Sequence, residues 1–244
     1  MTKRILITKE KGGVASTTTA VNLAYDLAQR GNRVLLVDMD TRGDCAACLG
    51  LDPAGGLYDV VRHVFGGDGS LLDNGAVRAR PGLDLIRTNT TGTATVLDLL
   101  RDVPLLGVSN LLSDIGMDYD YLLFDTSAAS GVLRRAAMQI ADLMVIPTRL
   151  EALGMPDIAS LIEAYGKRQR VIILPVCFRK LNVHQYNLSV LREAYGEPSF
   201  DGRVADAIPD RVAVIESHSA MRPVLEYEPM SDASVAYRAL TGDV

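Results

Sequence analysis

The chain has 244 residues, 48% of them hydrophobic and 23% charged, with a formal net charge of −5. These values are typical of a soluble globular domain; they exclude disordered and fibrous proteins, and they exclude nucleic-acid binding by overall charge. Three cysteines are too few for a disulfide framework. The N-terminus has a short basic start and an apolar run of only three residues, which predicts a first strand and not a signal peptide. No apolar run has transmembrane length. We therefore expect a cytoplasmic protein with a single domain, residues 1–244.

Short apolar runs alternate with helical patterns along the chain. The runs fall at residues 5–7, 33–38, 83–87, 119–125, 143–147 and 171–176, and the helical patterns at 17–30, 96–112, 132–140, 156–165 and 183–195. Continuous apolar runs of this kind are typical of parallel strands covered on both faces. The alternation predicts an α/β fold, a doubly wound and mostly parallel sheet flanked by helices. The Gly- and Asp-rich residues 66–73 are expected to form a surface loop.

A glycine-containing segment, KEKGGVASTTT at residues 9–19, lies between the first predicted strand and the first predicted helix. In an open parallel sheet, ligands bind beyond the carboxyl ends of the strands. Glycines let backbone N–H groups curl around an anion, and a helix N-terminus adds its positive dipole. Lys11, Gly12, Gly13 and Thr17 fit the roles of a lysine that reaches phosphates, a phosphate cradle and a hydroxyl that holds Mg²⁺.

The segment departs from the common P-loop pattern G-x-x-x-x-G-K-[ST] and resembles the deviant form K-G-G-x-x-K-[ST], except that Ser16 stands in place of the second lysine. Three sequence blocks, in the same order, resemble the ParA/MinD group of P-loop ATPases. They are TTTAVNLAYDLAQRGNRVLLVDMDTRGD, YDYLLFDTSA and IPDRVAVIESHSAMRPVLEYEPMSDASVAYRAL. The resemblance spans residues 3–240 and implies the P-loop NTPase fold of that group. An McdA-like member is also considered, because that branch has an unusual arrangement of its lysines.

The resemblance implies a site for ATP/ADP and Mg²⁺ at the interface of a nucleotide-sandwich homodimer. Lys11 would be the signature lysine that reaches the partner's phosphates, and Asp40 would orient the attacking water. Thr17, Asp40 and Asp125 would serve the metal ion. The alternative for Asp38 and Asp40 is a pair of strand-end caps. The further nucleotide contacts implied are Gly12, Gly13, Val14, Ala15, Ser16, Thr17 and Thr18 at the phosphates, and Pro209 and Arg211 near the adenine.

The missing P-loop lysine bears directly on activity, since loss of one such electrostatic group costs about 10²–10³ in rate. Glu10 adds negative charge, and Ala15 stands where the backbone favours glycine. Arg149, at the end of a predicted strand, is the first candidate for a replacement cation, with Lys9 and Arg42 next. Three outcomes stay open: a replacement cation, a very slow Mg²⁺-dependent ATPase, and a pseudo-ATPase.

The resemblance further implies a partition or positioning protein that segregates a plasmid, chromosome or protein body through a ParB-like adaptor. Non-specific DNA would contact Lys180, Arg203 and Arg222, although these are equally well read as ordinary solvated side chains. The alternative function is a pseudo-ATPase, or a permanently ATP-bound dimer, that acts as a scaffold or regulator. A MinD-like membrane regulator is disfavoured because the acidic tail lacks a basic amphipathic helix, so no membrane partner is expected.

The pair Cys45 and Cys48 forms a CxxC motif. Two copies in a dimer would offer four thiolates to a metal or an iron–sulfur cluster. We favour the simpler interpretation of two small buried residues at a helix start, because the chain has no second CxxC. The three histidines, His63, His184 and His218, lack metal-ligand spacing and are expected to be surface or cap residues.

Overall fold

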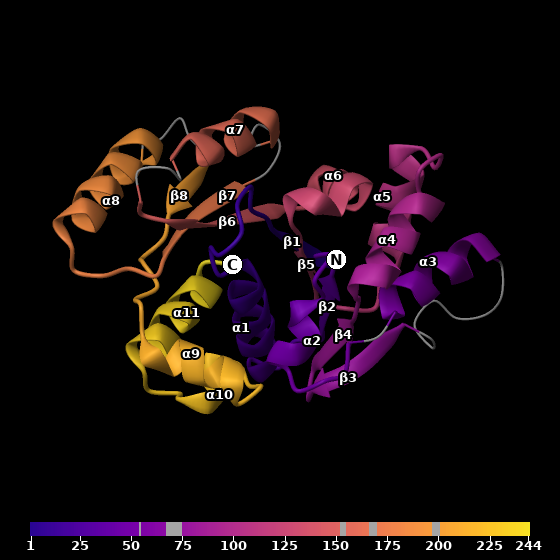
Figure 1. Cartoon of the computed structure of the whole chain (residues 1–244), viewed down its shortest axis with the longest axis horizontal. Coiled ribbons are helices and arrows are strands. Elements are labelled where there is room, and N and C mark those ends of the chain that lie inside the picture. The colour runs from indigo at the N-terminus through magenta and orange to yellow at the C-terminus, as the bar shows by residue number, and fades with distance from the viewer. Residues whose placement is uncertain (54, 67–74, 152–154, 166–169, 197–200) are drawn as a thin grey trace.

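The computed structural model describes the chain except for residues 54, 67–74, 152–154, 166–169 and 197–200 (Figure 1). Among the described residues, eight strands form one sheet in the order β3-β4-β2-β5-β1-β6-β7-β8. Neighbouring strands are parallel except β3 and β4, which are antiparallel. The predicted mostly parallel α/β sheet is therefore confirmed. The strands are β1 (Lys3–Ile7), β2 (Val34–Asp38), β3 (Ala76–Arg80), β4 (Leu83–Ile86), β5 (Tyr121–Asp125), β6 (Leu143–Arg149), β7 (Arg170–Val176) and β8 (Gly202–Val204).

Side chains of successive strand residues point to opposite faces of the sheet, so each buried strand presents apolar side chains on both faces. Helices cover both of these faces. In β1, Ile5 and Ile7 pack into one core cluster and Leu6 into the other. The first face carries α1 (Ser16–Gln29), α2 (Asp44–Cys48), α9 (Val212–Ser219), α10 (Val224–Tyr227) and α11 (Asp232–Gly242). The second carries α3 (Gly56–Gly66), α4 (Thr90–Leu99), α5 (Leu105–Asp114), α6 (Gly131–Ile140), α7 (Met155–Tyr165) and α8 (Asn182–Tyr195). A short 3₁₀ turn, Ala128–Ser130, precedes α6.

The prediction of one helix over residues 96–112 is wrong. Two helices occupy this region, α4 and α5, and Pro104 is the N-cap of the second. Proline lacks the N–H that a continuing helix needs and clashes with the preceding turn, so the chain must start a new helix there. The loop expected at 66–73 falls almost wholly outside the described residues, since only Gly66, the last residue of α3, is described.

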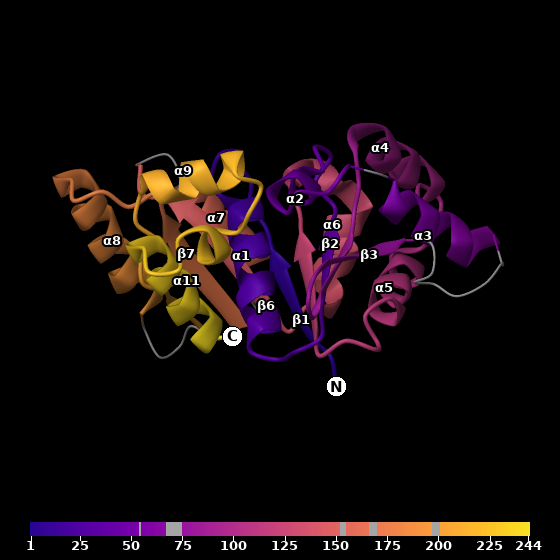
Figure 2. The ribbon, with the colours of Figure 1, turned by 90° about the horizontal axis from the view of Figure 1, so that it is seen from below.

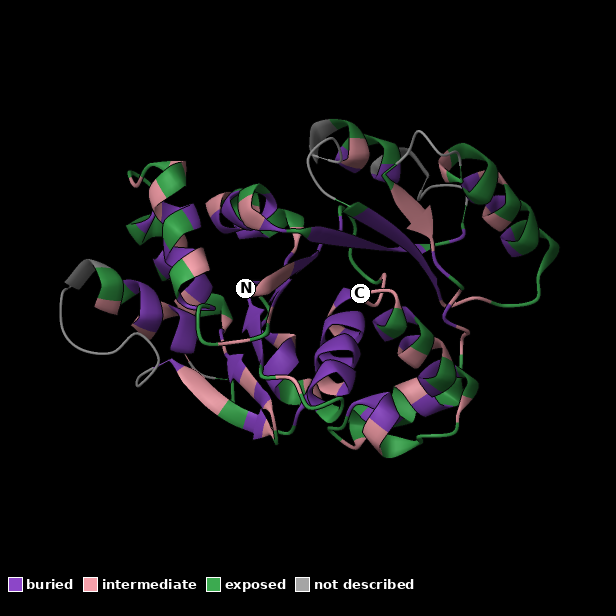
Figure 3. Cartoon of the chain, turned by 180° about the vertical axis from the view of Figure 1, so that it is seen from behind, coloured by how far each residue is buried: buried purple, intermediate pink, exposed green. Residues whose placement is uncertain are grey.

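Burial is concentrated in the central strands and in α1 (Figure 3). The helix α1 begins just beyond the carboxyl end of β1 and ends before Gly31, whose φ of +89° favours glycine. An ion pair of 2.8 Å between Asp26 and Arg30 closes its last turn. Figure 2 shows α2 and α9 at one end of the sheet and both chain termini at the other. No described helix combines the length and the apolar character needed to cross a membrane.

Candidate functional site

A cavity of about 520 Å³ lies at the carboxyl ends of β1, β6 and β7, over the N-terminus of α1. This is the edge of a parallel sheet at which ligands bind. Segments far apart in the sequence meet in its wall. The predicted site residues that line it are Gly13, Ala15, Ser16, Thr17, Thr18, Arg149, Pro209 and Arg211. Three other predicted residues, Lys11, Gly12 and Val14, line a neighbouring cavity of about 140 Å³.

The loop before α1 has the backbone of an anion site. Gly13 has a φ of +77°, and Ala15, the N-cap of α1, has a φ of 54° and a ψ of 32°. Ala15 is thus in the left-handed region, which costs a non-glycine residue about 1–2 kcal/mol. The expected strain at this position is present. The N–H groups of the first turn of α1 have no intrahelical acceptors, so they are available to an anion in the cavity.

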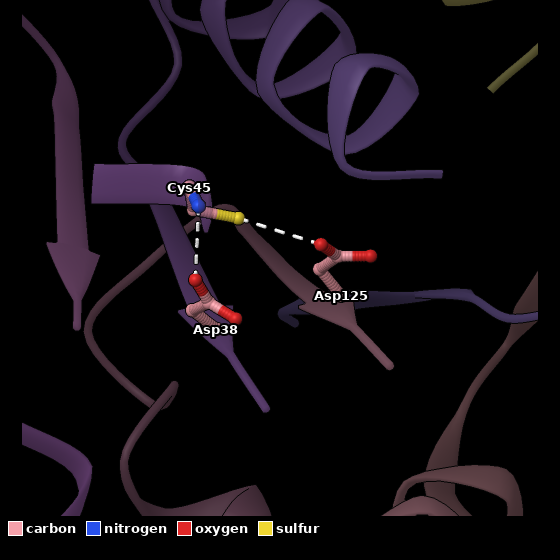
Figure 4. A group of neighbouring side chains, drawn as sticks. All are labelled: Asp38, Cys45 and Asp125. Atoms are coloured by element: carbon pink, nitrogen blue, oxygen red, sulfur yellow. Dashed lines mark hydrogen bonds between the residues drawn. The ribbon is translucent and has the colours of Figure 1, made fainter. Parts of the chain in front are cut away.

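Two carboxylates meet behind the loop, because β2 and β5 are neighbouring parallel strands that end in register at Asp38 and Asp125. Figure 4 shows both aspartates with Cys45 from α2 between them. Asp38 accepts hydrogen bonds from the backbone N–H groups of Asp40 (3.1 Å) and Cys45 (3.0 Å). The Cys45 Sγ lies 3.5 Å from Asp125 Oδ2. Burial, and then the charge of Asp125, raise the pKa of Asp38.

Asp125 has the surroundings of a cation ligand. Its Oδ2 accepts a hydrogen bond of 2.6 Å from the Thr17 hydroxyl, whereas its buried Oδ1 has no partner among the described residues. Burial raises the pKa of Asp125 to about 6, against the opposing effects of the Lys9 charge and the Thr17 hydrogen bond. An orphaned carboxylate oxygen beside a hydroxyl is a donor set suited to a hard divalent cation such as Mg²⁺. These residues therefore fit the predicted metal site.

Lys9 is buried between the loop and β2. Its Nζ donates a hydrogen bond to the Ser16 hydroxyl and forms an ion pair of 2.8 Å with Asp40 Oδ2. Both side chains of the ion pair are 6% exposed. Burial opposes ionisation of Asp40, but the hydrogen bond and charge of Lys9 outweigh it, so the pKa of Asp40 is lowered. Asp40 is consequently a carboxylate at neutral pH.

Glu10 does not leave a bare negative charge beside the loop. Its carboxylate pairs with Arg134 of α6, which also donates a hydrogen bond of 3.1 Å to Thr8. The Arg134 side chain is 11% exposed and the Glu10 side chain is 32% exposed, so the pair is partly shielded from solvent. The repulsion of an anion that the sequence suggested at Glu10 is therefore reduced.

The other candidate cations of the cavity are paired with carboxylates. Arg149 lies 3.1 Å from Glu151 and is 45% exposed, and Arg42 lies 3.2 Å from Asp44 and is 65% exposed. Arg211 forms an ion pair of 2.6 Å with Asp232 of α11. All three arginines still line the cavity.

The residues expected to contact DNA do not share one place. Lys180 is exposed beyond the carboxyl end of β7, and Arg222 is exposed between α9 and α10. Arg203 pairs with Ile172 in the register, near the start of β7, and its side chain is ion-paired with Asp243. Burial lowers the pKa of Arg203. Arg203 therefore lies toward the opposite end of β7 from Lys180.

His218 is exposed, as expected of a surface residue, although it lies at the cavity, whereas His184 differs from the expectation. His218 of α9 lines the cavity, and its Nε2 lies 3.0 Å from the Thr18 hydroxyl. Burial lowers its pKa, against the charge of Asp44. His184 is buried rather than on the surface, and its Nδ1 accepts the backbone N–H of Arg179 at 3.2 Å.

The position of Lys9 could have been predicted from the way side chains alternate between the two faces of β1. Ile5 and Ile7 face α1, so the same period of two directs residue 9 toward the start of α1. His218 offered no comparable signal, because its contact depends on how α9 packs against α1. Cys45 is fully buried, as expected of a small apolar residue, while Cys48 lines the cavity.

The AAA domain family profile matches residues 2–172. The chain is 28% identical over 256 residues to the chromosome partitioning protein ParA of Caulobacter vibrioides, covering 98% of this chain and 92% of that protein. Its fold is similar to that of the septum site-determining protein MinD from Pyrococcus horikoshii, solved with Mg-ADP, with a TM-score of 0.78, 19% identity, and coverage of 100% and 96%. It is also similar to that of apo McdA from Cyanothece, with a TM-score of 0.79, 17% identity, and coverage of 98% and 100%.

Proposed function

The chain belongs to the AAA domain family and is a ParA/MinD-like P-loop ATPase, and from this we propose that it binds ATP with Mg²⁺ and hydrolyses it slowly. The observation that supports the proposal best is the wall of the 520 Å³ cavity, where the loop before α1 and Thr17 lie directly in front of Asp125. The loop and the Thr17 hydroxyl line the cavity, and the Asp125 carboxylate, with one unpartnered oxygen, lies behind them within hydrogen-bond distance of Thr17.

Each polar group has a role in this proposal. The first-turn N–H groups of α1 bind phosphate oxygens, and the side chains of Thr18 and His218 line the same cavity. Thr17 and Asp125 hold the Mg²⁺, whose charge stabilises the negative charge that develops during phosphoryl transfer. Asp40, an ionised carboxylate, accepts a hydrogen bond from the attacking water and orients it. Pro209 and Arg211 line the part of the cavity assigned to the base.

Calorimetric titration of the protein with ATP and Mg²⁺ tests the proposal, together with a steady-state assay of phosphate release. We expect saturable binding, and we expect Asp40→Ala to bind ATP while losing turnover. Thr17→Ala should lose the Mg²⁺ dependence of binding. Absence of ATP binding at millimolar concentration would reject the function.

The relative named as a chromosome partitioning protein suggests the biological role. We propose that ATP binding drives a sandwich homodimer, in which the exposed Lys11 contacts the partner's nucleotide, and that the dimer binds DNA and an adaptor to position a cargo. Of the residues predicted to contact DNA, Lys180 and Arg222 are exposed. Binding to random duplex DNA should weaken with added salt and with Lys180→Glu, whereas Arg101→Glu should leave it unchanged.

One observation favours the alternative of a bound but non-hydrolysing dimer. Ser16 brings no charge to the phosphates, and Asp40 is engaged by Lys9 in the structure described here. A protein that binds ATP, dimerises and releases no phosphate over hours, with or without an adaptor, would be a nucleotide-dependent scaffold.

A further inference from the structure

Ser16 stands where the P-loop pattern has its second lysine, yet the ammonium group of another lysine lies against it. The Nζ of Lys9 donates to the Ser16 hydroxyl itself. Lys9 also lines both the large cavity and the smaller one beneath the loop. Its charge thus lies against the first residue of α1, beside the N–H groups that would bind an anion.

The contacts of Lys9 leave it one unused donor. A lysine ammonium has three N–H donors and no acceptor. One donor reaches Ser16 and a second reaches Asp40. The third makes no hydrogen bond to a residue that the structure describes, so it is available to an oxygen atom of a ligand in the cavity.

The other cations near the loop are less well placed. Arg149 and Arg42 are each paired with an acid of their own segment, and both are far more exposed than the 6% of Lys9. Charge is most effective where solvent is excluded, because the effective dielectric constant is lower there. Lys9 is therefore the better-shielded source of positive charge for an anion in this cavity.

We propose that Lys9 takes over the role of the missing P-loop lysine, contacting the terminal phosphates of the nucleotide from the end of β1. In the free protein, the Asp40 carboxylate holds the ammonium at this place. When nucleotide binds, a phosphate oxygen accepts the third N–H, and the charge of Lys9 offsets the negative charge that develops during transfer. This inference rests on the proposed ATP-binding function and names the residue that makes the site work without a lysine at position 16.

Moving the lysine from position 9 to position 16 tests this role of Lys9. We expect Lys9→Met to weaken ATP binding by roughly 10- to 100-fold, the range for a lost charged hydrogen bond, and to slow any turnover by about 10²–10³. The double variant Lys9→Met/Ser16→Lys restores the lysine to the position the pattern gives it, so affinity should recover. Arg101→Met, which removes an exposed cation from the segment that follows α4, is the control and should bind as the parent does.

Comparing ATP, ADP and AMP separates the loss of the Lys9 charge from a general disruption of the site. The loss in Lys9→Met should be larger for ATP than for ADP and smallest for AMP, because only the terminal phosphates are involved. A collapsed site would lose all three equally. Lys9→Met/Asp40→Asn removes both charges of the buried pair, which keeps the interior neutral, and it should still bind ATP weakly.

The possible results distinguish the proposed role of Lys9 from the proposed ATP-binding function on which it rests. If the parent protein binds no ATP, the proposed function fails. If the parent binds ATP and Lys9→Met binds it equally well, the function stands and the role of Lys9 is wrong. A loss in Arg149→Met with none in Lys9→Met would assign the role to Arg149.

Discussion

Lys9 and Asp40 form a buried ion pair, with 2.8 Å between Nζ and Oδ2, that joins the end of β1 to the segment after β2. Removal of one partner leaves a buried charge unpaired, which costs about 3–5 kcal/mol. We expect Lys9→Met and Asp40→Asn each to lower the free energy of unfolding by about 3 kcal/mol. The double variant should lose much less than the sum of the two, as measured by denaturant unfolding in a double-mutant cycle.

The exposed pair of Arg33 and Asp120 provides a matched control. Its side chains are 66% and 45% exposed, and the closest charged atoms are 3.2 Å apart. Solvent screens such pairs, so the coupling energy from an equivalent cycle should stay below about 1 kcal/mol. Equal coupling energies in the two cycles would show that burial does not strengthen the Lys9–Asp40 pair.

Ala15 carries backbone strain that a glycine would relieve. Its φ of 54° lies in the left-handed region, and we expect Ala15→Gly to raise the free energy of unfolding by about 1 kcal/mol. The control is Ala239→Gly at an exposed position inside α11, where the flexibility of glycine should instead cost about 1 kcal/mol. Thermal unfolding of the two variants should shift in opposite directions.

The buried Asp125 should make the metal-free protein more stable as the pH falls from 7 to 5. Its pKa in the folded state is raised to about 6, so the native state binds a proton in a range where the unfolded state does not. Stability rises on acidification wherever the native state binds more protons, here by about 1 kcal/mol. The pKa of Asp38 is also raised, by burial and by the charge of Asp125, so Asp38 contributes with the same sign, and Asp125→Asn should lose the part of the gain that belongs to Asp125.

His218 contributes with the opposite sign over the same range. Its pKa is lowered, so its protonation favours the unfolded state as the pH falls. The comparison of the parent with Asp125→Asn cancels this effect, because both proteins keep His218. If the two proteins respond to pH alike in denaturant unfolding, Asp125 is not the group that titrates.

The reactivity of the three cysteines can show whether nucleotide fills the cavity. Cys48 and Cys177 line it, whereas Cys45 is fully buried behind it. Burial raises the pKa of all three thiols, that of Cys48 to about 12, so alkylation should be slow. We expect ADP with Mg²⁺ to slow the alkylation of Cys48 and Cys177 further, measured by peptide mass spectrometry. Cys45 should stay unmodified in both conditions, and equal rates for Cys48 would mean that nucleotide does not fill this cavity.

The sequence predicted the interior strands and not the edges, for a physical reason. The strands β1, β2, β5, β6 and β7 are covered on both faces and read as continuous apolar runs. The outer strands β3 and β8 have sequences AVRAR and GRV, with much less burial, and carry no such signal. The helix α9 is equally hard to recognise, because Val212 and Ile215 are apolar but exposed, while Ala213 and Ser217 face the core.

The candidate site was predictable as far as it follows a motif. The loop before α1 and the acids at the ends of β2 and β5 are local patterns, and the sheet brings them together. Which cation replaces the missing P-loop lysine was not predictable, because it depends on the ion pair that each cation forms. Arg149 pairs with Glu151, and Lys9 pairs with Asp40. These partners lie two residues away in one case and thirty-one in the other, and only the folded chain shows which is buried.

The main chain that carries Lys9 is fixed to the sheet on both sides. The Thr8 N–H donates to Val145 O and the Thr126 N–H donates to Ile7 O, each at 3.1 Å. A long side chain that becomes immobile only when a ligand arrives loses rotamer entropy at that moment, up to about 2 kcal/mol for lysine. Here that loss has already occurred during folding. An anion that enters the cavity meets a preorganised positive charge, and its affinity is not reduced by the need to order that charge.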